Sequence, residues 1–275
     1  MLIIKDIPNL HLYLNAYKEK GYSTGYVPTM GALHEGHGSL IDKSYNDNQK
    51  TIVSIFVNEK QFNDAQDFES YPRNKGDDYN FCEDHKVDII FEPSAEEIYP
   101  KEYQPILNSY YQNILCDKYR PGHFDGVVTV LNQLFKIIQS DKVYFGEKDF
   151  QQLKIVESLI KKDFSNLKLI PVPTVRSKEG VALSSRNAKL SKKQMDELIS
   201  FQKDVFLFIA QLDSKIDLIE ANKKADEFIK GYEKFDYFEF RNSSNLSLEG
   251  NLKDSRLFYA IYKSKTRLID NLEIY

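Results

Sequence analysis

The order of hydrophobic and polar positions predicts an alternation of strands and helices over most of the chain. The run at 51–57 is apolar almost throughout, which is typical of a strand buried on both faces of a parallel sheet. The pattern indicates a doubly wound, Rossmann-like α/β sheet. Strands are predicted at 22–28, 51–57, 87–91, 142–145 and 168–174, and helices at 8–20, 39–46, 76–86, 127–138 and 150–162.

Two segments of this region have a less regular pattern. Residues 94–118 carry several tyrosines and prolines and suggest loops, with a short helix or strand at 106–115. Pro171 and Pro173 interrupt the strand at 168–174, so we expect either an edge strand or an irregular segment there.

The pattern changes character from Ser191 onward. Helices with charged outer faces are predicted at 191–212 and 217–231, and short strands at 237–240 and 256–262. We therefore predict a Rossmann-like domain at 1–176 and a smaller C-terminal α+β domain at 177–275.

Composition and charge exclude several classes of function. The net charge of −4 and a pI near 5.8 argue against a nucleic-acid-binding surface, which would be strongly basic. Residues 1–6 lack a signal-peptide layout, and no apolar run is long enough to cross a membrane. Cys82 and Cys116 do not suggest a disulfide framework or a metal set. We expect a cytoplasmic protein that binds neither nucleic acid nor membrane.

A strand-to-helix turn at 26–40 carries the first candidate site. Gly31 and Gly36 allow a tight turn and a close approach of the backbone to a ligand. The N-terminus of the following helix favours an anion, most naturally a phosphate. His34 and His37 can donate hydrogen bonds to phosphate oxygens. The turn therefore predicts a nucleotide site.

Two other interpretations of the histidines stay open. A zinc-protease helix places its histidines one residue further apart, and Gly36 interrupts the spacing here, so zinc is disfavoured and no metal ligand is assigned. The second alternative is a structural turn in which the histidines only cap the helix.

Two further segments offer groups for a triphosphate. Gly146 ends a strand, Lys148 can meet a phosphate, and Asp149 can accept ribose hydroxyls or simply cap the next helix. A plain capping role and a binding role are about equally favoured there. The run at 183–186 adds two serine hydroxyls and a guanidinium.

A small polar substrate is suggested by two amides after the strand at 51–57. Ligands of open α/β sheets bind at the carboxyl ends of strands, which is where Asn58 and Gln61 lie. The alternative is that they cap the end of the strand. The sequence has no P-loop motif and no set of residues resembling a nucleophilic triad.

Several motifs resemble the pantothenate synthetase (pantoate–β-alanine ligase) family. The run Pro-Thr-Met-Gly-Ala-Leu-His-Glu-Gly-His at 28–37 looks like its signature, and His-x-Gly-His is shared with the nucleotidylyl transferase superfamily. Further similarity lies at 56–73, 120–127, 145–153, 183–187 and 267–271. The chain departs from the family at Glu59, where proline is usual, and at 176–180, where Arg-Ser-Lys-Glu-Gly replaces Arg-Glu-Ala-Asp-Gly.

The resemblance implies an ATP-dependent ligase that makes pantothenate for coenzyme A synthesis through a pantoyl adenylate. It implies His37, His34 and Lys148 as catalytic residues. Gln61 and Gln152 would bind pantoate, and Gln61 would also bind β-alanine. The implied ATP-binding residues are Met30, Gly31, Ala32, Leu33, His34, Glu35, Gly36, His37, Gly146, Glu147, Lys148, Asp149, Val175, Leu183, Ser184, Ser185 and Arg186.

The resemblance also implies Mg²⁺ accompanying ATP, a homodimer, and a C-terminal domain that acts as a lid. It places 120–127 near the active site, where we interpret His123 as structural. Two rival functions stay open: a nucleotidylyl transferase acting on another small substrate, and a non-catalytic ATP-binding regulator. The pair Gln61 and Gln152 favours the ligase over the transferase, because amides suit a hydroxy acid better than a nucleotide phosphate.

Overall fold

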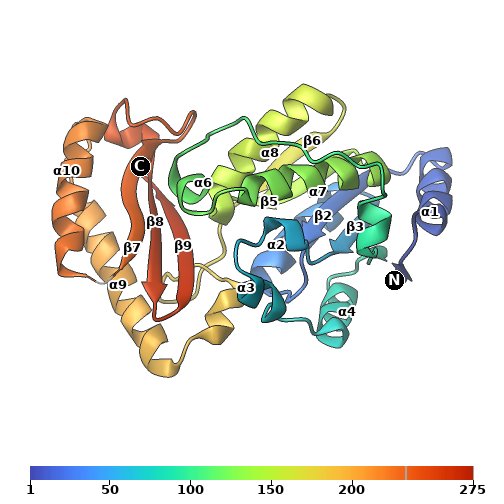
Figure 1. Cartoon of the computed structure of the whole chain (residues 1–275), viewed down its shortest axis with the longest axis horizontal. Helices are drawn as coiled ribbons and strands as arrows, with labels where there is room; N and C mark the ends of the chain where they lie inside the picture. The colour runs from blue at the N-terminus through green and yellow to red at the C-terminus, as the bar shows by residue number, and fades with distance from the viewer. Residues whose placement is uncertain (233, 275) are drawn as a thin grey trace. The chain divides into compact units, whose positions relative to one another are not determined.

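The computed structural model describes residues 1–232 and 234–274 and divides into two compact units (Figure 1). The first unit holds 1–147 and 152–173, and the second holds 148–151 and the described residues from 174 onward. The sequence did not anticipate that 148–151 packs with the second unit. The division into domains at 176 stays a prediction. No helix of these described residues is long and apolar enough to cross a lipid bilayer.

A parallel sheet of six strands forms the centre of the first unit, in the order β1-β4-β3-β2-β5-β6. The chain passes from β2 to β3 and β4 on one side and then returns to β5 and β6 on the other. The predicted doubly wound fold is therefore confirmed, with its reversal between β2 and β5. The strands are β1 Leu2–Ile4, β2 Thr24–Thr29, β3 Lys50–Ile55, β4 Ile89–Phe91, β5 Lys142–Gly146 and β6 Lys168–Val172.

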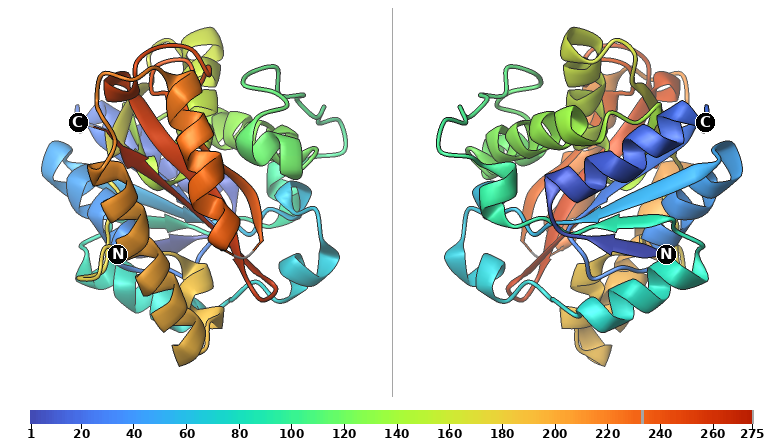
Figure 2. Two further views of the ribbon diagram at one scale, coloured as in Figure 1. Left: turned by 90° about the vertical axis from the view of Figure 1, so that its left-hand side faces the viewer. Right: turned by 90° about the vertical axis from the view of Figure 1, so that its right-hand side faces the viewer.

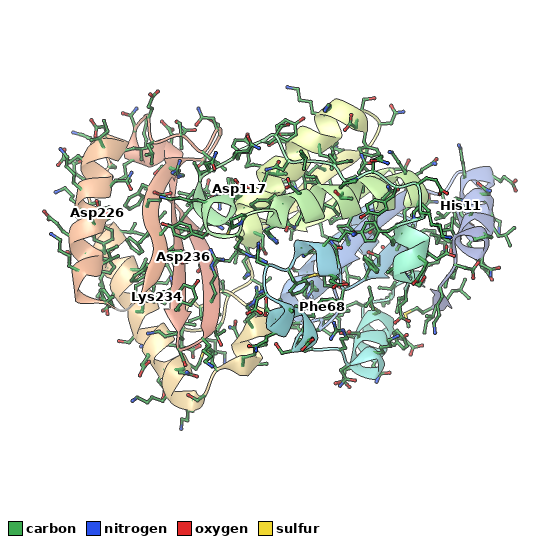
Figure 3. All side chains as sticks on the ribbon, in the orientation of Figure 1. His11, Phe68, Asp117, Asp226, Lys234 and Asp236 are labelled. Atoms are coloured by element: carbon green, nitrogen blue, oxygen red, sulfur yellow. The ribbon has the colours of Figure 1, made fainter. Side chains whose placement is uncertain are left out.

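Helices cover both faces of this sheet. Because parallel crossovers are right-handed, α1 (Ile7–Glu19), α7 (His123–Ile138) and α8 (Phe150–Asp163) lie on one face. Figure 2 shows α1, in dark blue, crossing the strands. His11 of α1, labelled in Figure 3, places its Nε2 3.0 Å from the carbonyl oxygen of Ile137 at the end of α7.

The opposite face carries α2 (Glu35–Asp47) and α4 (Lys75–Asp84). These two helices contact each other, since His85 Nδ1 lies 2.7 Å from Asp42 Oδ1. The same contact leaves no room for a side chain at position 38, where a Cβ would lie 2.8 Å from the His85 ring.

The connection between β4 and α7 is mostly irregular, as the prolines suggest, but one expectation for it is wrong. No helix or strand occupies 106–114, and α6 begins only at Leu115. Side chains of α7 satisfy this backbone instead, because Thr129 Oγ1 accepts from Ile106 N–H and Asp125 Oδ1 accepts from Asn108 N–H. The remaining short elements of this unit are η1 Glu59–Gln61, α3 Ala65–Glu69, α5 Ala95–Ile98 and α6 Leu115–Tyr119.

Strand positions agree with the apolar pattern except at the N-terminus. Every residue from Thr51 to Ile55 is buried, as expected for a central strand. Strand β6, which contains Pro171, lies at an edge of the sheet, which is one of the two alternatives predicted. Strand β1 was not predicted. It is three residues long and pairs only with β4, which gives it little room to show a pattern.

The second unit is an antiparallel sheet, β7-β8-β9, covered by α9 and α10. Figure 2 shows both helices, in gold and orange, against the red strands. Phe201 of α9 packs on Phe238 and Tyr259 of the sheet. The predicted α+β fold is confirmed, although strand β9 was missed. The elements are η2 Glu147–Asp149, η3 Ser185–Lys189, α9 Lys192–Ala210, α10 Leu218–Phe228, η4 Ile229–Gly231, β7 Phe235–Asn242, η5 Leu252–Asp254, β8 Ser255–Lys263 and β9 Thr266–Glu273.

Candidate active site

The turn between β2 and α2 is held from outside by a buried carboxylate. Gly31 and Ala32 have positive φ angles of 78° and 52°. Asp78 of α4 accepts from Ala32 N–H at 3.0 Å and from Leu33 N–H at 2.7 Å. A Cβ at position 31 would lie 2.8 Å from Asp78 Oδ2, which explains the glycine. These two N–H groups of the turn, which precede α2, are therefore occupied by the protein.

Asp78 was not predicted as a site residue from the sequence. It lies in a helix rich in polar residues, where nothing in the pattern distinguishes it from its exposed neighbour Asp77. In the structure Asp78 is only 4% exposed. Burial raises the pKa of the Asp78 carboxyl above its ordinary value, and the two backbone donors act in the opposite direction.

The two histidines cap α2 and support each other. His34 is the N-cap residue, and its Nδ1 accepts from Gly36 N–H at 3.0 Å. His37 Nδ1 accepts from His34 N–H at 3.3 Å, which completes a capping box. The ring centroids are 4.2 Å apart. The sequence left open that the histidines cap the helix. The structure shows that Nδ1 of each ring does so.

This cap fixes the chemistry of the other ring nitrogens. An Nδ1 that accepts a hydrogen bond carries no hydrogen, so in the neutral imidazole the hydrogen is on Nε2. His34 and His37 therefore each present an Nε2–H donor. Gly36 belongs to the same arrangement, because a Cβ there would lie 2.7 Å from His34 Cε1. Capping and phosphate binding are compatible, since they use different atoms of the same side chains.

Gln61 lies beside this turn, at the carboxyl end of β3. Its Nε2 donates to Met30 Sδ at 3.0 Å, and its Oε1 accepts from Asn58 Nδ2 at 3.0 Å. Two predicted site residues, Met30 and Gln61, are thus in direct contact.

The side chain of Asn58 bonds to Gln61 and to other groups of the protein. Its Oδ1 accepts from Lys60 N–H and from the Tyr99 hydroxyl, and its Nδ2 also donates to the Gly126 carbonyl. Asn58 is 1% exposed. The expectation that it contacts a substrate is not supported by this geometry, because its polar atoms are taken up by the protein. The alternative, a capping role at the end of the strand, is what the structure shows.

The backbone of Gln61 is held by the start of α7. His123 Nδ1 donates to the Gln61 carbonyl at 2.7 Å, and Arg120 Nη2 donates to the same oxygen at 3.2 Å. Arg120 Nη1 also donates to His123 Nε2 at 3.0 Å, which places the His123 hydrogen on Nδ1. His123 is 7% exposed, so its geometry is that of a structural residue, as interpreted from the sequence.

Lys148 and Asp149, which belong to the second unit, are the last two residues of the short helix η2 just before α8. Lys148 Nζ lies 3.6 Å from Asp149 Oδ2, with the lysine side chain 20% exposed and the aspartate 49% exposed. Just before them in the chain, Gly146 has no atom within 4 Å of the place where a Cβ would lie. A side chain at position 146 would therefore meet open space. Gln152, in the first turn of α8, is half-buried.

The segment at 175–187 forms a hairpin followed by η3. Leu183 N–H donates to the Val175 carbonyl at 3.0 Å, so these two predicted site residues are paired. Ser184 caps η3, with its Oγ accepting from Arg186 N–H at 3.3 Å. The cap fixes Ser184, Ser185 and Arg186 in one compact turn.

Comparison with known proteins gives one consistent family. Residues 2–273 match a family model described as Pantoate-beta-alanine ligase. The pantothenate synthetase of Caldicellulosiruptor bescii is 37% identical over 286 residues, covering 100% of this chain and 99% of that protein. That of Aquifex aeolicus is 37% identical over 281 residues, covering 99% of each.

Solved structures agree with these sequence relatives. Pantothenate synthetase from Thermus thermophilus has a TM-score of 0.90 at 31% identity and covers 100% of both chains. Pantoate-beta-alanine ligase from Francisella tularensis, described as complexed with Beta-gamma ATP and Beta-alanine, has a TM-score of 0.83 at 36% identity. That match covers 99% of this chain and 97% of the other. The chain therefore belongs to the pantoate-beta-alanine ligase family.

Proposed function

We propose that this ligase joins pantoate to β-alanine in two steps at the expense of ATP. A carboxylate oxygen of pantoate attacks the α-phosphorus of ATP, and the bond to pyrophosphate breaks. The amine of β-alanine then attacks the acyl carbon of the pantoyl adenylate, AMP leaves with the electron pair of the C–O bond, and the amine loses a proton. The product is pantothenate, the precursor of coenzyme A.

The observation that carries this proposal is the contact between Gln61 and the turn that bears the histidines. The Gln61 amide, held through Asn58 and Met30, suits a hydroxy acid, and the nearby Nε2–H donors of His34 and His37 suit a phosphate. Donors fixed before the reaction stabilise the charge that develops on the transferred phosphate. A hydroxy acid and an α-phosphate are the two partners of the adenylation step.

The roles of individual residues are part of the proposal. His37 supports charge at the α-phosphate with His34 beside it, and Lys148 acts as a further catalytic cation. Gln61 and Gln152 bind pantoate, and Gln61 also binds β-alanine. We propose that ATP contacts Met30, Gly31, Ala32, Leu33, His34, Glu35, Gly36, His37, Gly146, Glu147, Lys148, Asp149, Val175, Leu183, Ser184, Ser185 and Arg186. For Ala32 and Leu33 this means contacts other than the N–H bonds to Asp78.

Mg²⁺ enters this proposal together with ATP. Within 1–232 and 234–274, no three His, Cys, Asp or Glu side chains are grouped so that they could hold a metal ion. A magnesium ion bound through the phosphates and water needs no such protein cage. We further propose that the protein is a cytoplasmic homodimer. Light scattering coupled to gel filtration would measure the mass of the dimer.

The central experiment is isotope exchange between labelled pyrophosphate and ATP. We expect the purified protein to exchange label only when pantoate is present, and to do so without β-alanine, because the first step is complete before the amine enters. Exchange without pantoate would contradict the proposal. So would pantothenate formation without any exchange, and a nucleotide left on the final product would favour a nucleotidylyl transferase.

Gly126→Ala tests the placement of Gln61. A Cβ at 126 would lie 2.3 Å from the Lys60 carbonyl oxygen and 2.7 Å from Gln61 N, so the backbone of η1 has to move. A displacement of a substrate-positioning group by about 1 Å can lower the reaction rate by up to about a hundredfold. We therefore expect KM for pantoate to rise at least about tenfold. Steady-state kinetics with each substrate varied would measure this effect. Gly76→Ala is the control, because its Cβ meets only Asn74 at 3.9 Å; equal effects from both substitutions would contradict the assignment.

A further inference from the structure

Two segments of the second unit carry proposed ATP ligands, and both are attached to neighbouring residues of β9. The segment 148–151 includes Lys148, and the segment 174–187 includes Ser184 and Arg186. Asp270 and Asn271 of β9 bind these segments.

Asp270 holds the hairpin through Arg176. Arg176 Nη1 donates to Asp270 Oδ2 at 2.6 Å and Nη2 donates to Oδ1 at 3.0 Å, so the ion pair is bidentate. The same guanidinium donates to the Gly180 carbonyl at 3.1 Å, across the hairpin. Asp270 also accepts from the Tyr259 hydroxyl at 3.1 Å and is 6% exposed. The hairpin that leads into Ser184 is thereby fixed to the sheet.

Asn271 holds the other segment through the backbone of Lys148. Its Nδ2 donates to the Lys148 carbonyl at 3.0 Å, and its Oδ1 accepts from Arg256 Nη1 at 2.8 Å. The guanidinium of Arg256 lies 4.2 Å from the ring centre of Phe150, two residues after Lys148. Asn271 is 2% exposed. The Lys148 carbonyl is thus tied to β9, and the Phe150 ring that follows it in the chain packs on Arg256 of β8.

The register of the sheet explains why one dipeptide reaches both segments. Successive side chains of a strand point to opposite faces. Asp270 pairs with Tyr259, whose ring packs on Phe201 of α9, and Asn271 pairs with Phe258, whose ring lies 5.8 Å from that of Phe150. One face therefore receives the hairpin and the other receives 148–151.

We propose that Asp270 and Asn271 are positioning residues for ATP, which together hold Lys148 and the 184–186 turn in a fixed relation. This inference rests on the proposed function, because it assumes that both segments contact the phosphates. A rigid pair of anchors lets the phosphate donors be aligned before ATP binds, so less binding energy is spent on ordering them.

The test is a double-mutant cycle between Asn271 and Lys148. We expect Asn271→Ala to raise KM for ATP at least tenfold and to lower kcat, while KM for pantoate changes less than twofold. In a Lys148→Ala background the same substitution is expected to change KM for ATP less than threefold, because the side chain it positions is gone. Equal fold-changes in both backgrounds would overturn the proposal. If Asn271→Ala does not fold, Asn271→Ser serves, since a serine side chain is too short to reach the Lys148 carbonyl.

Two controls separate this role from general stability and from the proposed function. Asn222→Ala removes another amide of the second unit that bridges backbone groups, at Phe240 and Leu218, away from both segments. It is expected to lower the melting temperature and leave KM for ATP unchanged. If the wild-type protein showed no pantoate-dependent exchange, the proposed function would fail. The cycle would then be measured by calorimetric titration with Mg-ATP, where additive losses of affinity would still overturn the positioning role.

Discussion

Replacing His37 by alanine is expected to lower kcat for pantoate-dependent adenylation by about 100- to 1,000-fold, the usual effect of deleting one fixed donor to a transition state. The Nε2–H of His37 is oriented before ATP binds, because Nδ1 of the same ring is used in the helix cap. KM for ATP should change much less than kcat. Rapid-quench measurement of adenylate formation would give the rate of this step.

Three substitutions at this position separate capping from catalysis. Position 37 is the third residue of α2, where glutamate and glutamine ordinarily complete a capping box. His37→Glu should therefore keep the fold stable but lose activity, because a carboxylate cannot donate to a phosphate. His37→Gln should retain part of the activity, since its amide can accept from His34 N–H and still donate. His11→Ala is the control for loss of an imidazole elsewhere in the unit. Equal activity of His37→Glu and wild type would return His37 to a purely structural role.

The histidine cap shows where reasoning from sequence was sound and where it stopped. The spacing of His34, Gly36 and His37 predicted a turn at the end of β2, and it left capping and phosphate binding as competing alternatives. In the structure Nδ1 of each ring serves the cap, and the phosphate contact that we propose would use Nε2. A sequence pattern does not contain that division, because it depends on where each ring lies relative to the backbone N–H groups.

The other features that were not predicted from the sequence were missed for physical reasons. The parallel sheet was predictable because buried strands such as β3 are apolar throughout, whereas β9 carries Arg267, Asp270 and Asn271 and so lacks a clear alternation. Burial of Asp270 and Asn271 depends on partners about 90 and 120 residues away in the chain, at Arg176 and Lys148. The loop at 106–114 was ambiguous because its backbone is satisfied by side chains of α7.

Asp78→Ala is expected to cause the largest loss of stability among the substitutions considered. It removes the acceptor for Ala32 N–H and Leu33 N–H in a largely buried place. An unsatisfied buried donor costs about 1–3 kcal/mol, so the free energy of unfolding should fall by about 2–4 kcal/mol. Urea unfolding followed by circular dichroism would measure this change. Activity should fall as well, since the turn carries Gly31 and the N-cap residue of α2.

Two companion substitutions locate the cause of that loss. Asp78→Asn keeps one acceptor oxygen of the same shape, so its effect on the free energy of unfolding should be about half that of alanine. Asp77→Ala, one residue away in the first turn of α4, removes an exposed carboxylate that accepts from nearby Asn74, and should change stability by less than about 0.5 kcal/mol. If Asp77→Ala and Asp78→Ala were equally destabilising, the loss would come from the charge at the start of the helix. A deficit confined to Asp78 would establish that this carboxylate holds the turn in which the histidine donors are set.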